Sequence, residues 1–322
     1  MKAYVYGANG AAITDVAKPE PKGTQVLVRV RACGLNRADL GMTKGHAHGS
    51  AGGLGIVLGM EWAGEIAELG PQAKGVKVGD KVMGSGGAAF AEYTLADHGR
   101  LFRTPSNMNF EEAATLPVAL ATMHNAVVTN GALQPGQSVL IQGASSGVGL
   151  MALQIAKFKG ASLVIGSSTN ATRRARLKDF GADLAVDSGD PGWVDEVLKA
   201  TGGEGVDLIV DQVSGKVANQ NLAATKIKGR IVNVGRLGGT RAEFNFDLHA
   251  AHRISYIGVT FRTRSIEEIR EIFDEVRKDI WPAVESRKLQ LPIDKVFAFD
   301  DIGKAFEHME ANRHLGKIVV TL

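Results

Sequence analysis

The stretch VLIQGASSGVGLMALQIAK (residues 139–157) predicts a buried strand, a glycine-rich turn and the start of a helix. Its glycines, Gly143, Gly147 and Gly149, follow the pattern G-x-x-x-G-x-G. Small residues at such a turn let the backbone approach a pyrophosphate, whose charge is stabilised at the helix N-terminus. A glycine turn alone is also typical of any tight strand-to-helix connection, so its surroundings decide the interpretation.

The residues around this turn alternate between short apolar strands and helices. Predicted strands cover SVLIQG, SLVIGSS, ADLAVD, VDLIVDQV, RIVNVG and ISYIGVT, and the helix expected before RIVNVG is KVANQNLAATKI (216–227). This alternation predicts an α/β fold with a doubly wound parallel sheet of about six strands, the size of a dinucleotide-binding domain. Residues 1–100 instead predict mostly strands. The tail after residue 265 predicts helices and a strand that returns to the first domain.

The end of the second strand of the parallel sheet selects the cofactor. An acidic residue there would accept the ribose 2′-hydroxyl of NAD. The segment VIGSSTNATRR (164–174) has no carboxylate; it offers hydroxyl side chains, among them Ser168, and then Arg173 and Arg174. Hydroxyls with a guanidinium suit a 2′-phosphate and favour NADP(H). The alternative is that both arginines lie on a solvated helix face.

The composition of the chain excludes several classes of function and site. The chain has 322 residues, 44% apolar and 22% charged, with 37 basic and 34 acidic side chains. The net charge of +3 without a block of like charge argues against a nucleic-acid surface. A single cysteine, Cys33, cannot form an internal disulfide or a multi-thiolate zinc site. Because the start lacks a signal-peptide pattern and no apolar run reaches ~18 residues, we expect a cytoplasmic protein without a membrane or nucleic-acid partner.

Eight segments occur in an order that resembles the medium-chain dehydrogenase/reductase superfamily, and within it the zinc-independent, ζ-crystallin-like quinone oxidoreductases. They are ACGLNRADL, LGMEWAGEIAELG, GDKVMG, AFAEYTLAD, AATLPVALAT, GASSGVGLMALQIAK, GRIVNVGRLGG and ANRHLGKIVV. This resemblance covers almost the whole chain. It implies a GroES-like, β-rich catalytic domain over residues 1–117, completed by 260–322, and a Rossmann NADP(H)-binding domain over 118–259. It also implies an active site at their junction and a homodimer.

The resemblance makes a zinc site testable. The catalytic zinc ligands of the zinc-dependent relatives fall here on Asn36, Met60 and Val118. None of these side chains replaces a thiolate or an imidazole as a zinc ligand. The structural four-cysteine lobe is also missing, because Cys33 is alone. We therefore expect no metal. We expect Cys33 itself to be a small buried residue rather than a reactive thiol.

The resemblance also assigns positions to the cofactor and the substrate. Asn36 and Thr122 match positions near the nicotinamide. The other matched cofactor positions are Ser146, Gly147, Val148, Ser168, Arg173, Gly235, Phe261 and Asn312. The expected substrate pocket contains Asn36, His46, Met60 and His124. Glu61 matches an acid that usually has a structural role.

The pocket departs from the family pattern. Gly41 and the region of His46 stand where many relatives have Tyr, His124 replaces an aromatic residue, and Ser188 replaces a Tyr that packs on adenosine. His46 is a candidate proton donor, since imidazole exchanges protons near neutral pH. The alternative is that His46 and His48, in the loop GHAHG, are simply exposed. No catalytic residue is assigned; the candidates are Asn36, His46 and Thr122.

These features favour a zinc-independent, NADPH-dependent reductase. Without a Lewis acid, hydride must go to an acceptor that is already electrophilic, such as a quinone. Two alternatives stay open. One is an ene reductase of small enones, acrylates or enoyl thioesters, and the other is an NADPH-binding protein with little turnover.

Overall fold

The computed structural model describes residues 1–49 and 52–322, which form two compact units. The first comprises Met1–Ala121 and Phe261–Leu322, and the second comprises Thr122–Thr260. The expected boundary after residue 117 and the observed one after Ala121 both fall within helix α3 (Pro117–His124). The mixed α/β fold, with a parallel Rossmann-type sheet and a β-rich GroES-like part, is the predicted one.

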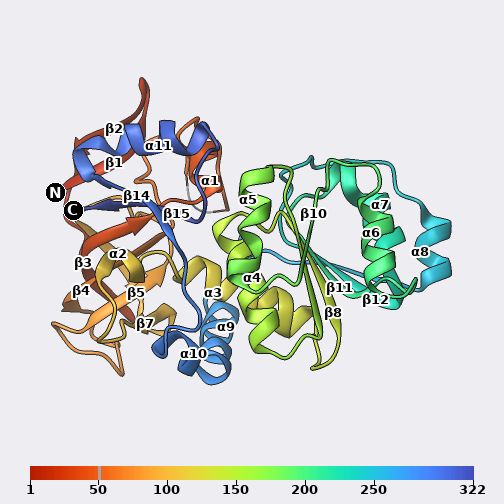
Figure 1. Ribbon diagram of the computed structural model, residues 1–322. Coiled ribbons are helices and arrows are strands. Elements are labelled where there is room, and N and C mark those ends of the chain that lie inside the picture. Colours follow the sequence, from red (N-terminus) through yellow and green to blue (C-terminus); the bar gives the residue numbers. More distant parts are fainter. Residues whose placement is uncertain (50–51) are drawn as a thin grey trace. The chain divides into compact units, whose positions relative to one another are not determined.

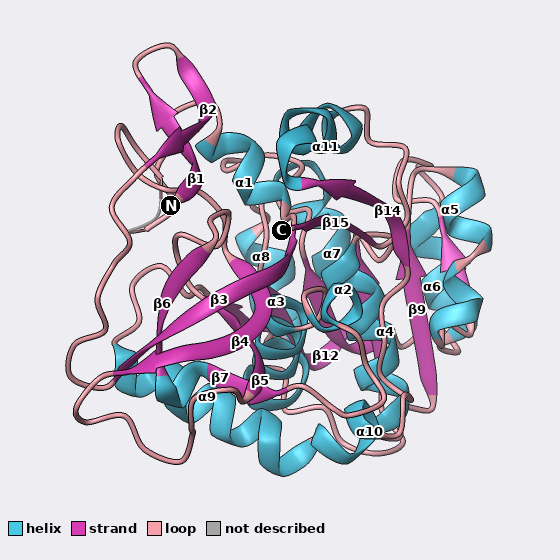
Figure 2. Cartoon of the chain, turned by 90° about the vertical axis from the view of Figure 1, so that its left-hand side faces the viewer, coloured by secondary structure: helices cyan, strands magenta, loops and turns pink. Residues whose placement is uncertain are grey.

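The first unit is built on a seven-stranded sheet that combines both ends of the chain (Figures 1 and 2). Its strands, in sheet order, are β14 (Ile293–Ala298), β15 (Lys317–Thr321), β3 (Gln25–Gly34), β4 (Glu61–Leu69), β5 (Lys81–Ser85) and β7 (Leu101–Arg103), with β6 (Tyr93–Asp97) also pairing with β3. A separate hairpin consists of β1 (Lys2–Gly7) and β2 (Gly10–Asp15). The predicted return of the C-terminal strand is confirmed, because β15 pairs antiparallel with β3.

The helices of the first unit have between four and fourteen residues, and one of them, α3, continues into the second unit. They are α1 (Arg37–Met42), α2 (Phe110–Ala113), α3, α9 (Ile266–Asp279), α10 (Trp281–Glu285) and α11 (Ile302–Glu310), with 3-10 turns at His98–Arg100 and Phe299–Asp301. Helix α2 ends at Ala113 and α3 begins at Pro117, a residue that suits the first helical position. Trp62, Phe90 and Phe306 are among the buried residues of this unit's core.

The second unit holds the predicted six-stranded parallel sheet. In sheet order its strands are β10 (Leu184–Val186), β9 (Leu163–Ser167), β8 (Ser138–Gln142), β11 (Val206–Asp211), β12 (Thr225–Asn233) and β13 (Ser255–Gly258). Its helices are α4 (Gly147–Phe158), α5 (Ala171–Ala175), α6 (Trp193–Ala200), α7 (Ala218–Ala224) and α8 (Phe246–His252), with a π-helical turn at Asn125–Asn130 and 3-10 turns at Leu177–Phe180 and Gly215–Val217. Figure 1 shows α4 and α5 on one face of the sheet and α6, α7 and α8 on the other.

The helix predicted over 216–227 is wrong at its end. Helix α7 stops at Ala224, and Thr225 already begins β12, which runs beside β11 with a register shift. Thr225 and Ile227 are β-branched, which favours a strand, whereas sequence alone joined them to the helical run before them. The sheet order changes direction between β8 and β11, so the carboxyl ends of these strands form the switch point of the sheet.

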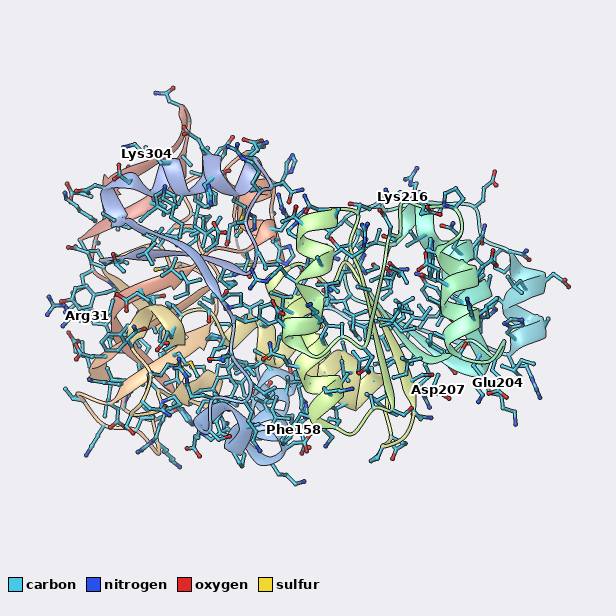
Figure 3. The ribbon with its side chains drawn as sticks, in the orientation of Figure 1. Arg31, Phe158, Glu204, Asp207, Lys216 and Lys304 are labelled. Carbon is cyan, nitrogen blue, oxygen red and sulfur yellow. The ribbon has the colours of Figure 1, made fainter. Side chains whose placement is uncertain are left out.

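Charged side chains are distributed over the periphery of both units. Arg31 and Lys304 lie at the edge of the first unit, and Glu204 and Lys216 at the edge of the second (Figure 3). No helix among the described residues combines the length and the apolar character needed to cross a bilayer.

Candidate active site

Ser146 and Gly149 determine the shape of the glycine turn after β8. Ser146 is the N-cap of α4, and its Oγ accepts a hydrogen bond from the Gly149 N–H at 3.1 Å. A Cβ atom on Gly149 would lie 2.7 Å from Ala144 Cα, Ala144 O and Gly143 O, so only glycine fits there. Gly147 and Val148 form the first turn of α4, whose N–H groups have no acceptor within the helix. The turn thus fits a pyrophosphate at a helix N-terminus.

A network of neutral polar side chains supports this turn from beneath, and sequence reasoning missed it. Ser167 Oγ accepts from the Gly143 N–H at 3.0 Å and donates to Gln142 Oε1 at 2.6 Å. Gln142 Nε2 donates to Asn221 Oδ1, and Gln212 Nε2 donates to the Gln142 carbonyl. All four side chains are buried. The sequence does contain a signal for this network, because otherwise apolar strands end in polar residues, as in LIQG and VDQV.

The end of β9 carries the residues expected to meet the 2′-phosphate. Ser168 Oγ donates to Ser145 Oγ at 3.0 Å, which connects it to the glycine turn. Arg174 is held in place: its Nη1 donates to Asp187 Oδ2 and to the Ser168 carbonyl, each at 2.8 Å. Arg173 follows the N-cap Asn170 on α5 and is half-buried. Arg174 therefore has a structural role, and Arg173 is the candidate for a phosphate by its place after β9.

Gly235 follows β12 and comes close to the neighbouring connection. Its N–H donates to the Asp211 carbonyl at 3.1 Å, and a Cβ atom there would lie 2.5 Å from Gln212 O. Gly235, Ser146 and Gln212 thus lie at the same carboxyl edge of the sheet, because Gln212 also accepts from Ser146 Oγ at 3.0 Å. The structure therefore places Gly235 and Ser146, two of the expected cofactor positions, at the same edge of the sheet.

In the first unit, three strand ends converge on Asn36. Strand β3 ends at Gly34, opposite Glu61 at the start of β4, and Lys317 begins β15, which pairs with β3. Gly34 leaves room for the Glu61 side chain, since a Cβ atom there would lie 2.9 Å from Glu61 Oε1. The register of the paired strands therefore brings together the amide of Asn36, the carboxylate of Glu61 and the ammonium group of Lys317.

These three side chains and Asp39 form a hydrogen-bonded cluster, which we call the Asn36 cluster (Asn36, Asp39, Glu61 and Lys317). Asn36 Nδ2 donates to Glu61 Oε1 at 2.9 Å, and Lys317 Nζ donates to Asn36 Oδ1 at 3.0 Å. Lys317 also donates to Glu61 Oε1, and the Val118 N–H donates to Glu61 Oε2 at 2.9 Å. Asp39 Oδ2 accepts from the Asn36 backbone N–H at 2.7 Å.

Burial controls the titration of the acids in this cluster. Asp39 and Glu61 are fully buried and Lys317 is 4% exposed. Burial raises the pKa of Asp39 to about 7, the Asn36 N–H and Lys317 oppose the rise, and Glu61 adds to it. Burial also raises the pKa of Glu61, against the charge of Lys317 and the three donors. Burial and both acids raise the pKa of Cys33 well above its usual range, so its thiol is not activated.

The three residues that the resemblance matches to zinc ligands have other contacts in the structure. Asn36 is bonded to Glu61 and Lys317, Met60 packs against the core of the first unit, and Val118 contributes its backbone N–H to Glu61. Within residues 1–49 and 52–322, no three His, Cys, Asp or Glu side chains are grouped so that they could hold a metal ion. These residues do not fit a zinc ion.

The remaining predicted residues are placed as follows. Phe261 lies in the first unit with the Arg264 guanidinium 5.9 Å from its ring centre. Asn312 is exposed, with φ of 52°, and its Oδ1 accepts from Arg37 Nη2 at 2.8 Å. Thr122 and His124 belong to the second unit, and His124 is buried.

The histidines of the loop GHAHG differ in exposure. His46 is exposed, and His48 is half-buried near Arg262, where burial and the guanidinium charge lower the pKa of His48. The Arg262 guanidinium beside His48 disfavours a second cation there, so His46 and His48 do not suit a metal ion. Residues 50–51 of the same loop lie outside the described part of the chain.

Two family models and a quinone oxidoreductase-like protein match this chain. The family model described as an alcohol dehydrogenase GroES-like domain matches residues 22–106, and the one described as a zinc-binding dehydrogenase matches residues 147–278. Quinone oxidoreductase-like protein 2 of Mus musculus is 30% identical over 312 residues, which cover 96% of this chain and 88% of that protein.

Two further matches are a polyketide synthase and an enoyl reductase. A phenolphthiocerol/phthiocerol polyketide synthase of Mycobacterium tuberculosis is 29% identical over 96% of this chain, but the chain spans only 14% of that protein. The crystal structure of CurK enoyl reductase superimposes with a TM-score of 0.87 at 26% identity, and the match covers 99% of each chain.

Proposed function

Because the chain belongs to the medium-chain dehydrogenase/reductase superfamily, we propose that it is a zinc-independent, NADPH-dependent reductase of quinones or similarly activated acceptors. Membership makes it an oxidoreductase that uses a nicotinamide cofactor. The Asn36 cluster is the observation that supports a zinc-independent reductase. In it, an amide bonded to a buried ion pair occupies the position where zinc-dependent relatives place a metal ligand.

The chemistry follows from what the chain provides at each place. The reduced nicotinamide supplies a hydride. The glycine turn, Ser146 and Arg173 would bind and orient the phosphates, and Asn36 would offer a hydrogen bond to the oxygen of the acceptor. A single amide stabilises new negative charge much less than a zinc ion does. We therefore propose an acceptor whose own conjugation spreads that charge, as a quinone does.

A panel of acceptors tests this function. The loss of NADPH absorbance would be followed with quinones, simple ketones, enones and enoyl thioesters, each with and without a chelator. We expect turnover with quinones, none with simple ketones, and no effect of the chelator. Turnover that the chelator abolishes would contradict the zinc-independent mechanism, and saturable NADPH binding without turnover of any acceptor would favour a binding protein.

The second candidate is reduction of activated C=C bonds, and the comparisons with a polyketide synthase and with CurK enoyl reductase favour it. It uses the same cofactor residues and the same amide, because hydride addition to an enone also creates an enolate oxygen. The panel separates the two candidates: higher kcat/KM for enoyl thioesters than for any quinone would favour the ene reductase.

Arg173 is expected to determine the choice between NADPH and NADH. We expect Arg173→Glu to raise KM for NADPH by about 10- to 100-fold, because the variant replaces a charge-assisted hydrogen bond to the 2′-phosphate with repulsion. KM for NADH should change by less than about threefold, since NADH lacks that phosphate. Steady-state kinetics with both cofactors measure the ratio.

Lys199→Glu is the matched control for Arg173→Glu. It makes the same charge reversal at an exposed position near the end of α6, so it changes the net charge equally. We expect it to leave both KM values unchanged. If Arg173→Glu affected NADPH and NADH alike, the assignment of Arg173 to the 2′-phosphate would be wrong.

We also propose a homodimer in the cytosol. Strand β13 is an edge of the six-stranded sheet, and unpaired edges are templates for pairing. Beside it Phe244 contacts Phe246 and Tyr256, and Phe246 is 75% exposed. An exposed aromatic patch next to an open edge suits a second copy, and sedimentation velocity at several concentrations tests this. A single buried cysteine is compatible with a reducing compartment.

A further inference from the structure

The Asn36 cluster determines which way the carboxamide of Asn36 faces. Lys317 ends in an ammonium group, which can only donate hydrogen bonds, and ionised Glu61 can only accept them. Lys317 Nζ lies 3.0 Å from Asn36 Oδ1, and Glu61 Oε1 lies 2.9 Å from Asn36 Nδ2. Turning the amide by 180° would set its NH₂ against the ammonium and its oxygen against the carboxylate. The ion pair therefore permits one orientation.

This orientation leaves a defined part of the amide for another partner. A carboxamide nitrogen carries two N–H donors. Within the described residues, one of them is bonded to Glu61, while the carboxamide oxygen accepts from Lys317. Asn36 is half-buried rather than buried, which leaves its second N–H for a ligand, and the two bonds favour a single orientation of the side chain.

A buried ion pair contributes little net free energy to the stability of a core. Glu61 is fully buried and Lys317 is 4% exposed, and removing two charges from water offsets most of their attraction. Apolar side chains of the same size often stabilise a core as well or better. Fixing the orientation of a neighbouring amide is, in contrast, a task that apolar side chains cannot perform.

We propose that Lys317 and Glu61 are positioning residues that orient Asn36 so that its free N–H meets the oxygen of the hydride acceptor. This inference rests on the proposed reductase function. It adds that the chain replaces the metal of its zinc-dependent relatives with an amide whose direction is set by a buried ion pair. Lys317 and Glu61 act through Asn36 and do not touch the acceptor.

A double-mutant cycle tests whether the pair acts through Asn36. Lys317→Met with Glu61→Gln keeps side-chain size and removes both charges together, so no ion is left buried alone. We expect this pair variant to lower kcat/KM for the accepted quinone or enone about tenfold, the value of one oriented hydrogen bond. In an Asn36→Ala background the same two substitutions should change kcat/KM less than about twofold.

Two controls separate positioning from a general loss of structure. Lys317→Arg keeps a buried donor cation and should retain more than half of the wild-type kcat/KM. The dissociation constant for NADPH should change far less than kcat/KM in the pair variant, because the residues expected to bind the phosphates belong to the second unit. Equal losses of kcat/KM from the pair variant in the wild-type and Asn36→Ala backgrounds would overturn the proposal.

A readout without turnover separates this inference from the proposed function. In ¹H–¹⁵N spectra of the protein without cofactor, the side-chain amide signals of Asn36 are identified by their loss in Asn36→Ala. We expect these signals to shift in the pair variant and to return close to their wild-type positions in Lys317→Arg. If they do so while the wild type reduces no acceptor, the orienting role stands and the reductase function fails. Unchanged Asn36 signals in the pair variant would overturn the orienting role itself.

Discussion

Gly149→Val is expected to abolish saturable NADPH binding and to lower the free energy of unfolding by about 3 kcal/mol. A Cβ atom at this position would lie 2.7 Å from two atoms of Ala144 and from the Gly143 carbonyl oxygen. These are backbone atoms of the phosphate-binding turn itself, so they cannot move aside as a flexible side chain would. Relief requires the turn to open, which also breaks the Ser146 cap on α4. Fluorescence titration with NADPH and denaturant unfolding measure both effects.

The control for Gly149→Val is Gly303→Val, near the start of α11. Both glycines lie in the first turn of a helix and neither has a positive φ, but a Cβ atom on Gly303 meets nothing within 4 Å. We expect Gly303→Val to leave stability within about 0.5 kcal/mol and NADPH binding unchanged. A Gly149→Val protein that bound NADPH with wild-type affinity would contradict the assignment of the glycine turn to the pyrophosphate.

Local chemistry made the second unit predictable from the sequence. Short apolar strands, helices with apolar faces and a glycine turn occur in the order that a doubly wound sheet requires, and each signal lies within about 20 residues. The error at the end of α7 arose where two signals compete. Thr225–Ile227 continue a helical run but are β-branched, and the partner strand β11, which decides the outcome, comes earlier in the chain.

The Asn36 cluster was only half predictable. The resemblance to dehydrogenases placed Asn36 at a zinc-ligand position, and Glu61 was assigned a structural role. Nothing local links them to Lys317, which lies 281 residues after Asn36 and meets it only because β15 pairs with β3. The buried network of Gln142, Ser167 and Asn221 was missed for the same reason, because each bond joins different strands or helices.

The stability of the protein is expected to depend on pH through Asp39, and Asp39→Asn is expected to remove this dependence. The pKa of Asp39 is about 7 in the folded protein, because of burial, against 3.8 ordinarily. Between these values the unfolded chain releases its proton while the folded chain keeps it. Stability from this group is therefore complete below about pH 4, falls as pH rises, and is lost above about pH 7. Each pKa unit corresponds to about 1.4 kcal/mol, so the total is about 4 kcal/mol.

Asp39→Asn keeps an oxygen that can accept from the Asn36 N–H, but it cannot ionise. We expect the variant to become more stable relative to wild type by up to about 4 kcal/mol between pH 4 and pH 8, as measured by denaturant unfolding. The exposed Asp195→Asn on α6 serves as the control and should follow the wild-type profile. The slope of the free energy of unfolding against pH is compared between the three proteins. Glu61, Lys317 and Cys33, which surround Asp39, are present in all of them. Parallel profiles for wild type and Asp39→Asn would mean that Asp39 is already ionised in the fold, held by Lys317 more strongly than burial opposes it.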